Sequence, residues 1–262
     1  MTELRNIAKE RLAAGELALG MGLRQARGVD IGKIMKACGY DWLFIDMEHN
    51  AMSIEDAVNI SIAAQDAGIT PVVRVPGFEH YHATRVLDGG ALGIVVPHVD
   101  TPKQAAQVVD NCKYPPLGHR SVTGALPQLD FAAMPMAEAT KAVNDATMIV
   151  VMLETPQAVE NADAIAAVEG VDVLLMGTND LTVEMGIPGE LGHDRVAAAY
   201  EKVIAACNAH GKYAGLGGVY APDLMERYVG MGMRLILTGS DLSMMMIAAK
   251  DRSAFMRGLD LG

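Results

Sequence analysis

Short runs of apolar residues alternate with longer amphipathic segments along the chain. The apolar runs lie at residues 17–23, 42–47, 71–75, 92–99, 148–154, 171–177, 213–218 and 234–239. Nearly continuous apolar runs of this length are typical of parallel strands that are covered by helices on their outer face. We therefore predict one β-strand for each run.

The segments between these runs carry alanines and larger aliphatic residues at three- and four-residue spacing, which predicts amphipathic helices. The clearest helical patterns cover residues 53–68, 102–112, 136–144 and 194–211. Ser53 followed by Asp56 resembles a capping box, and Gly68 and Gly211 stand where helices commonly end. The pattern as a whole is an alternation of strands and helices.

Eight strands in 262 residues predict an α/β fold of the (β/α)₈ (TIM) barrel type, as a single domain over residues 1–262. An open, doubly wound sheet is the main alternative, because periodicity does not tell whether a sheet closes. The GxGxxG motif that often accompanies the open sheet is missing. One connection, residues 113–135, is unusually long, and such loops in compact domains are usually functional or form lids.

Composition and charge narrow the class of function. The net charge is −11 at pH 7, and the chain has no cluster of Lys and Arg, so it is a poor candidate for binding nucleic acid or an anionic membrane. The cysteines Cys38, Cys112 and Cys207 form no CxxC pair, which argues against a disulfide framework and a thiolate zinc site. The N-terminus does not resemble a signal peptide, and no apolar run reaches the roughly 18 residues of a membrane span. We expect a soluble, cytoplasmic protein.

Charged residues follow several of the predicted strands, where a TIM barrel forms its active site. Glu154 follows the fifth strand and Asp180 follows the sixth, within the turn GTNDL. Two carboxylates with few other protein ligands suit a hard divalent cation such as Mg²⁺ or Mn²⁺. The structural alternative is that each acid caps the helix that follows it. The turn before Asp180 also offers backbone N–H groups that can receive a carboxylate.

His49 and Arg74 are further candidates at strand ends. A histidine in this position can act as a general base, although a hydrogen-bonded loop histidine is an equally good interpretation. Arg74 interrupts the apolar run PVVRV, and a buried guanidinium needs an anion, either Asp46 of the protein or a substrate group. No predicted strand ends in lysine, so aldol chemistry through an imine is not expected.

Several motifs in their order along the chain resemble the HpcH/HpaI aldolase family, the metal-dependent class II pyruvate aldolases. These motifs are IDMEH (45–49), VVRV (72–75), VLDGGALGIVVPHVDT (86–101), KYPPLGHRS (113–121), LETPQAVEN (153–161) and VEGVDVLLMGTNDLTVEMG (168–186). The resemblance covers nearly the whole chain. It implies a (β/α)₈ barrel that assembles into a homo-hexamer, a trimer of dimers, with the last helix packed on a neighbouring subunit. It also implies a lyase that reversibly cleaves a 4-hydroxy-2-oxoacid to pyruvate, or a related 2-oxoacid, and an aldehyde.

The resemblance assigns roles to the same strand-end residues. By matching motif, Glu154 and Asp180 are the metal ligands, with Mg²⁺ or Mn²⁺ expected and Co²⁺ or Zn²⁺ as alternatives. His49 is the catalytic histidine, and Arg74 holds the oxygen of the pyruvate enolate. The metal would act as a Lewis acid on the pyruvyl unit while His49 takes the proton of the 4-hydroxyl group.

Five further residues take roles from the resemblance. Asp88 matches the acid that pairs with the catalytic histidine, and Asp46 matches the acid of the IDxEH segment. The turn that receives the pyruvate carboxylate corresponds to Gly177, Thr178 and Asn179.

Two departures from the family pattern bear on substrate choice. Met152 stands two residues before Glu154, where family members usually carry glutamine and use it at the substrate site. The turn GTNDL replaces the usual GPADL or GPSDL. Two alternatives stay open: a lyase of the citrate-lyase-β or malyl-CoA-lyase type, which would need a basic surface for CoA phosphates, and a non-catalytic homologue that binds a metabolite.

Overall fold

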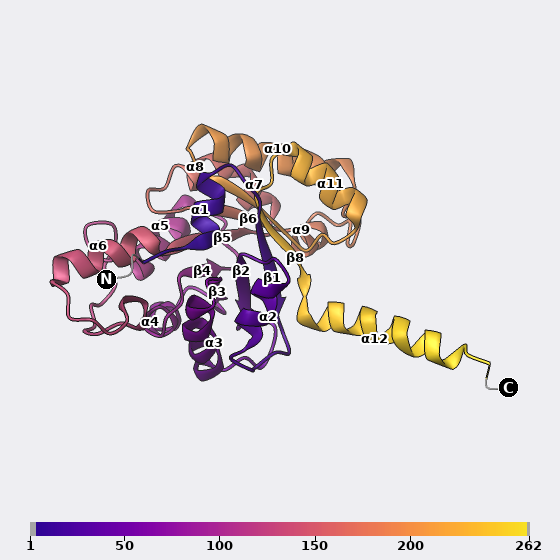
Figure 1. Cartoon of the computed structure of the whole chain (residues 1–262). Coiled ribbons are helices and arrows are strands. Elements are labelled where there is room, and N and C mark those ends of the chain that lie inside the picture. Colours follow the sequence, from indigo (N-terminus) through magenta and orange to yellow (C-terminus); the bar gives the residue numbers. More distant parts are fainter. Residues whose placement is uncertain (1–3, 261–262) are drawn as a thin grey trace.

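The computed structural model describes residues 4–260, and within them the predicted strands close into a parallel barrel (Figure 1). Each strand pairs with the next along the chain, and β8 pairs with β1, so the open-sheet alternative is excluded. The strands are β1 (Ala18–Leu23), β2 (Trp42–Asp46), β3 (Thr70–Arg74), β4 (Gly93–Val96), β5 (Met148–Leu153), β6 (Val173–Gly177), β7 (Tyr213–Gly217) and β8 (Leu235–Ser240).

Helices alternate with the strands, as predicted. They are α1 (Ile7–Ala13), α2 (Ile31–Ala37), α3 (Ile54–Asp66), α4 (His80–Asp88), α5 (Pro102–Cys112), α6 (Met136–Ala146), α7 (Pro156–Glu160), α8 (Ala162–Ala166), α9 (Thr178–Glu184), α10 (Asp194–Ala209), α11 (Pro222–Met231) and α12 (Asp241–Arg257), with a 3₁₀ turn at η1 (Pro127–Leu129). The predicted capping box at the start of α3 is present, since Ser53 and Asp56 bond each other's backbone N–H groups. Gly68 and Gly211, just past α3 and α10, have positive φ angles of 69° and 64°, which glycine adopts without strain.

The barrel interior is a packed core. Trp42, Phe44, Val150 and Leu175 are all buried in it, as expected when alternate residues of each strand point inward. Gly20 makes room for the indole ring, because a Cβ at this position would lie 2.2 Å from Cε2 of Trp42. The alternate strand residues, such as Leu43, Val73 and Ile94, pack against the helices in a second, larger cluster.

The N-terminal helix covers the N-terminal end of the barrel. The Asn6 side chain donates to the carbonyl oxygens of Leu92 and Ala146, at 2.9 and 2.8 Å. The N–H of Ala8 donates to the hydroxyl of Thr70 at 3.1 Å. These contacts fix α1 at the start of β3, β4 and β5, and leave the C-terminal ends of the strands as the end where a site can form.

The long connection between α5 and α6 is also attached to the N-terminal end. Lys113 donates from Nζ to the carbonyl oxygens of Asn144 and Thr147, both at 2.6 Å. Further along, Arg120 forms a 2.6 Å ion pair with Asp88 at the last turn of α4. The sequence predicted that this segment is functional or forms a lid. Within the described chain it does not cover the C-terminal rim, so the prediction of a lid is wrong.

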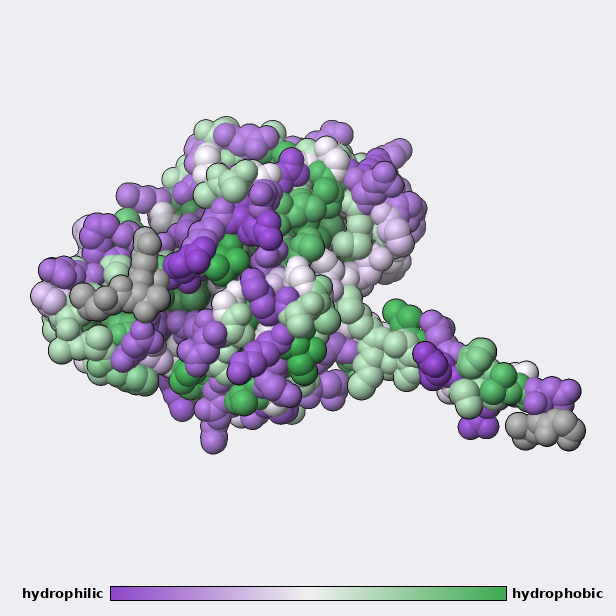
Figure 2. Space-filling view, viewed as in Figure 1, coloured by the Kyte–Doolittle hydropathy of each residue, from purple (hydrophilic) through white to green (hydrophobic). Residues whose placement is uncertain are grey.

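The last helix, α12, extends away from the barrel (Figure 1). None of its residues is buried, and its exposed apolar side chains include Met245, Ile247, Phe255 and Met256. Figure 2 shows hydrophobic and hydrophilic residues mixed along the projecting arm. Packing of this helix on a neighbouring subunit stays a prediction. No helix in the described part of the chain combines the length and apolar character needed to cross a membrane.

Candidate active site

A small cavity of about 150 Å³ lies at the C-terminal ends of the strands. Eight of the ten predicted site residues line it: His49, Arg74, Met152, Glu154, Gly177, Thr178, Asn179 and Asp180. They come from the ends of β2, β3, β5 and β6 and from the first turn of α9. The barrel therefore brings together residues that are far apart in the sequence, as the strand-end argument predicted.

Arg74 is held by acidic and aromatic neighbours. Its Nε and Nη2 atoms donate to the two carboxylate oxygens of Asp46, at 2.9 and 2.7 Å. Its Nη1 atom forms an ion pair with Oε2 of Glu48 at 2.8 Å, and the guanidinium carbon lies 5.0 Å from the centre of the Phe44 ring. A bidentate pair of this kind fixes the plane of the guanidinium. N–H groups on Nη1 and Nη2 that these acids do not use remain for an oxygen in the cavity.

Asp46 is the structural partner of Arg74. The sequence had left open whether the anion beside Arg74 is Asp46 or a substrate group. Burial alone would raise the pKa of this carboxyl, but the hydrogen bonds and charge of Arg74 outweigh burial and hold the pKa below its ordinary value. The backbone N–H groups of Glu48 and His49 add to the same effect by donating to Oδ1. Asp46 is therefore ionised at neutral pH and orders the loop that carries His49.

Glu154 is a buried acid in the floor of the cavity. Its Oε2 atom accepts the backbone N–H of His98 at 2.7 Å, and the imidazole of His98 lies 3.4 Å from the same oxygen. A Cβ at position 177 would lie 2.4 Å from Cγ of Glu154, so Gly177 leaves the space that this side chain occupies. Burial raises the pKa of Glu154, and the negative charges of Asp180 and Glu48 raise it further.

A cation between Glu154 and Asp180 would remove this electrostatic cost. Asp180 stands in the first turn of α9, exposed at the cavity wall, and its charge acts on Glu154. Within residues 4–260, no group of three or more His, Cys, Asp and Glu side chains could hold a metal ion. If a cation bound here, Glu154 and Asp180 would supply two carboxylates and leave further coordination positions to water or substrate oxygens.

His49 lies at the mouth of the cavity, with its side chain 52% exposed. Its Nε2 atom is 3.7 Å from Oε2 of Glu48, and its carbonyl oxygen accepts a hydrogen bond from Nη2 of Arg24 at 2.9 Å. The backbone of His49 is thus held by Asp46 and Arg24, while its ring remains accessible. This is a suitable arrangement for a group that exchanges a proton with a bound molecule.

The turn after β6 and the neighbouring Met152 complete the wall. Thr178 is buried, with its hydroxyl 2.6 Å from that of Tyr200 and donating to the carbonyl oxygen of Gly217 at 2.7 Å. Its side chain therefore fixes the turn. The binding of a carboxylate by the backbone of this turn stays a prediction. Asn179 is exposed, and the sulfur of Met152 lies 4.0 Å from Nη1 of Arg74.

Asp88 does not lie with the other predicted residues. It ends α4, before β4 begins, and is ion-paired with Arg120 at the N-terminal end of the barrel. Within the described chain the predicted pair with His49 does not form, because the two residues lie at opposite ends of the strands. The catalytic role of Asp88 stays a prediction.

Sequence reasoning did not assign a role to several residues of the cavity. Arg24 and Tyr220 line it from the loops after β1 and β7. His98 does not line the cavity, but it contacts the cavity residue Glu154, and it does so with a left-handed backbone, with φ of 54°. The position of Arg24 directly after an apolar run was the one available signal for its place at the rim.

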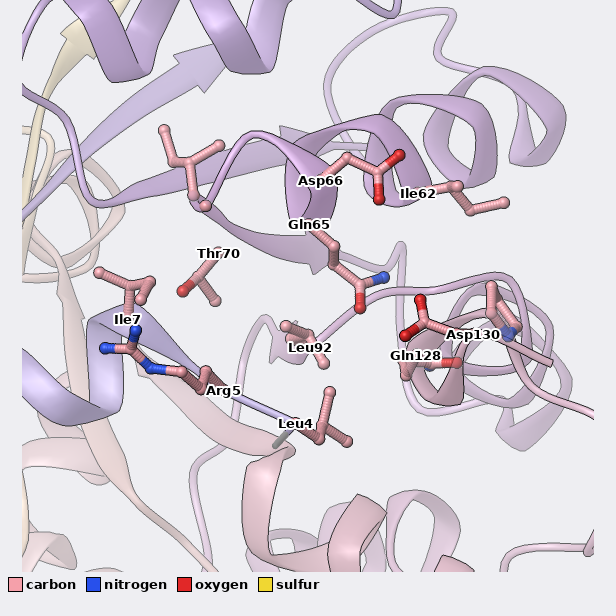
Figure 3. Close-up of a pocket in the computed structure, with 13 residues that line it drawn as sticks. Leu4, Arg5, Ile7, Ile62, Gln65, Asp66, Thr70, Leu92, Gln128 and Asp130 are labelled. Atoms are coloured by element: carbon pink, nitrogen blue, oxygen red, sulfur yellow. The ribbon is translucent and has the colours of Figure 1, made fainter. Parts of the chain in front are cut away.

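A larger cavity, of about 370 Å³, lies at the N-terminal end of the barrel (Figure 3). Figure 3 shows Arg5 and Ile7 on one side of it and Gln128 and Asp130 on the other. None of the predicted site residues lines this cavity. Size therefore does not identify the site, and the convergence of acids, arginine and histidine favours the smaller cavity.

Comparisons with known proteins agree with this geometry. The family model described as HpcH/HpaI aldolase/citrate lyase matches residues 26–248. A 4-hydroxy-4-methyl-2-oxoglutarate aldolase of Hapsidospora irregularis is 38% identical, over 100% of this chain and 98% of that protein. A 2-keto-3-deoxy-L-rhamnonate aldolase of Escherichia coli (strain K12) is 34% identical, over 97% of this chain and 94% of that protein.

A solved structure shows the same fold at full length. The crystal structure of an HpcH/HpaI aldolase from Desulfitobacterium hafniense DCB-2 covers 98% of this chain, and this chain covers 99% of that one, with a TM-score of 0.92 and 31% identity. The predicted barrel and the predicted family are both confirmed. The chain belongs to the HpcH/HpaI aldolase/citrate lyase family, and its full-length relatives place it among the aldolases of that family.

Proposed function

We propose that this protein is a divalent-metal-dependent aldolase that reversibly cleaves a 4-hydroxy-2-oxoacid to pyruvate, or a related 2-oxoacid, and an aldehyde. The observation that carries the proposal is the convergence of Glu154, Asp180, Arg74 and His49 on one cavity at the C-terminal rim. The named aldolases among its relatives support the same reaction class.

Glu154 and Asp180 are the residues that would hold the cation. Carboxylate oxygens suit Mg²⁺ or Mn²⁺, with Co²⁺ or Zn²⁺ as alternatives. The raised pKa of Glu154 fits this role, because burial and neighbouring negative charge make an unpartnered carboxylate costly there. When bound, the cation supplies a Lewis acid for the 2-oxo and carboxylate oxygens of the pyruvyl unit. The backbone N–H groups of the turn from Gly177 to Asn179 support the proposed binding of that carboxylate.

Arg74 has the geometry to stabilise charge that develops on the 2-oxo oxygen. Its bidentate bond to Asp46 and its ion pair with Glu48 fix the guanidinium before substrate arrives. Fixed donors aimed at a developing charge lower a barrier because they need no rearrangement during the reaction. Since Asp46 and Glu48 leave some N–H groups unused, Arg74 can donate to the substrate without giving up either partner.

His49 is the proposed base. In the cleavage direction it takes the proton of the 4-hydroxyl group, directly or through a water molecule, as the C3–C4 bond breaks. Its exposed ring at the mouth of the cavity gives it access to that hydroxyl and to solvent, which must remove the proton afterwards. In the condensation direction the protonated ring returns the proton to the new alkoxide.

We also propose that the protein works as a cytoplasmic homo-oligomer, a hexamer built as a trimer of dimers. The free thiols of Cys38, Cys112 and Cys207 suit a reducing compartment. The apolar side chains of α12, including Ile247 and Phe255, are exposed on a helix in which no residue is buried. Exposed apolar surface of this kind favours association, and a second copy of the chain is the proposed partner.

The test of the proposed function is pyruvate release from a panel of 4-hydroxy-2-oxoacids. The protein is treated with a chelator, and Mg²⁺, Mn²⁺, Co²⁺ or Zn²⁺ is then added back. We expect release that disappears on chelation and returns with a divalent cation. Absence of release across the panel with every cation would refute the proposal. Metal-dependent binding of pyruvate without turnover would favour a metabolite-binding protein, and cleavage of acyl-CoA thioesters alone would favour a CoA-ester lyase.

A further inference from the structure

We propose that Arg24 recognises a second carboxylate, on the aldehyde-derived half of the substrate, and so makes the enzyme selective for dicarboxylic 4-hydroxy-2-oxoacids. The proposal rests on the proposed function, because it assigns a substrate class to the same cavity. Arg24 directly follows β1 and lines the cavity together with His49. It is therefore a residue of the rim, on the side of the proposed base.

The charge of Arg24 is available to a ligand. Arg74, the other arginine of the cavity, is paired with two carboxylates. Arg24 has no carboxylate partner for its guanidinium in the described part of the chain, and its one side-chain hydrogen bond goes to the carbonyl oxygen of His49. A guanidinium has five N–H donors in a planar arrangement that matches a carboxylate. Arg24 therefore has the unused donors and the charge for a bidentate contact.

The backbone that carries Arg24 is fixed. The carboxylate of Asp241, the first residue of α12, accepts the N–H groups of Arg24, Gln25 and Ala26, at 2.8, 2.9 and 2.6 Å. Three hydrogen bonds to one carboxylate hold the loop after β1 in a single conformation. Since binding costs less when a group is already in place, this clamp favours a role for Arg24 in recognition.

The proposed base links Arg24 to the C4 end of the substrate. Glu154, Asp180 and Arg74 serve the pyruvyl half, and His49 serves the hydroxyl on C4. A substituent on C4 is bonded to the same carbon as that hydroxyl, so it would lie close to His49. Arg24 lines the same cavity, and its Nη2 atom is 2.9 Å from the His49 carbonyl oxygen, so it lies beside the proposed base. A carboxylate on C4 would meet Arg24 there, whereas an uncharged alkyl group would not engage it.

The test compares two substrates that differ only in this substituent. 4-Hydroxy-2-oxoglutarate carries a carboxylate on C4, and 4-hydroxy-2-oxopentanoate carries a methyl group. For Arg24→Gln we expect kcat/KM for the glutarate to fall about 10- to 100-fold, the effect of one lost charge-assisted hydrogen-bonded contact. The value for the pentanoate should stay within about twofold. Arg24→Lys keeps the charge, so its kcat/KM for the glutarate should lie between the values of Arg24→Gln and of the unaltered protein. Lys33→Gln, which removes an exposed positive charge from the neighbouring α2, is the matched control and should leave both values unchanged.

Each other outcome refutes the proposal in a distinct way. An unchanged value for the glutarate would show that Arg24 does not bind the second carboxylate. An equal fall for both substrates would show that Arg24 acts by holding the backbone of His49. If the unaltered protein cleaves neither substrate with any divalent cation, the proposed function itself fails, and the present proposal fails with it.

Discussion

Two buried arginines, at opposite ends of the barrel, share two features: an ion pair with an aspartate and an aromatic ring nearby. Arg74 pairs with Asp46 and lies 5.0 Å from the centre of the Phe44 ring, at the C-terminal rim. Arg120 pairs with Asp88 and lies 4.6 Å from the centre of the Tyr114 ring, at the N-terminal end. Each arginine pairs with at least one carboxylate and lies over an aromatic ring, so these two features do not by themselves mark a catalytic arginine.

The difference lies in what each arginine faces. Arg74 lines a cavity that also contains Glu154, Asp180 and His49. The side chain of Arg120 is fully buried, and it ties the long connection after α5 to the end of α4. In TIM barrels, residues at the C-terminal rim serve the reaction and residues at the other end serve stability. The comparison teaches that the surroundings of the pair, rather than the pair itself, decide between the two roles.

Replacing Arg74 should have the largest effect on activity. We expect Arg74→Ala to lower retro-aldol turnover by about 10²-fold or more, because the charge that develops on the 2-oxo oxygen loses a fixed donor. The loss should appear in steady-state pyruvate release by protein whose fold is verified by circular dichroism. Arg74→Lys tests geometry, since it keeps the charge without the planar set of donors. Turnover near that of the unaltered protein would show that Arg74, like Arg120, is structural.

Replacing His49 should have a comparable or slightly smaller effect. We expect His49→Ala to lower turnover by about 10²-fold, the usual contribution of a positioned general base. His119→Ala is the matched control, because that histidine is 84% exposed and lies on the long connection at the other end of the barrel. If both variants keep normal turnover, the base is another group and the role assigned to His49 is wrong.

Replacing Lys113 should affect stability and leave turnover per folded molecule unchanged. Lys113→Met leaves the carbonyl oxygens of Asn144 and Thr147 without their donor, which should cost about 1–3 kcal/mol in the free energy of unfolding. Chemical denaturation measures this cost. A variant with full stability and lost activity would contradict the assignment of stability to the N-terminal end of the barrel and of the reaction to the C-terminal end.

The lowered pKa of Lys113 predicts a smaller effect, a dependence of stability on pH. Burial lowers the pKa of Lys113 from 10.5 to about 8, so between these values the unfolded chain binds more protons than the folded one. Stability should therefore rise with pH in this window, by about 1 kcal/mol between pH 8 and 9. Lys113→Met should lack this rise. A rise of equal size in the variant would assign it to other groups.

The sequence was sufficient to predict the barrel and most of the cavity lining. Each strand contains a nearly continuous apolar run, Glu154 directly follows one of them and Asp180 lies in the turn after another, so local pattern and barrel topology together place them at one rim. The contact between His98 and Glu154 was not predictable, because it depends on a left-handed residue that no local pattern requires. The side of the barrel covered by residues 113–135 was also not predictable.

The role proposed for Arg24 was also not predictable from the sequence. Its apolar flanking run placed it at a strand end, but its role depends on contacts with His49 and Asp241, which are distant in the sequence. For Asp88, in contrast, the sequence did predict a role. Its motif matched a catalytic position, yet the fold places it with Arg120, away from His49. Pairings between distant segments are set by tertiary structure, and the sequence of a single chain does not reveal them.

The central claim is that Glu154 and Asp180 form a divalent-cation site on which turnover depends. Calorimetric titration of Mn²⁺ into the unaltered protein and into Glu154→Gln, each also assayed for pyruvate release, tests it most directly. Glu160→Gln is the matched control, since that glutamate is exposed and paired with Lys202. We expect Glu154→Gln to weaken Mn²⁺ binding by more than about 100-fold and to lose pyruvate release, while Glu160→Gln keeps both. Mn²⁺ binding and pyruvate release by Glu154→Gln equal to those of the unaltered protein would contradict the claim.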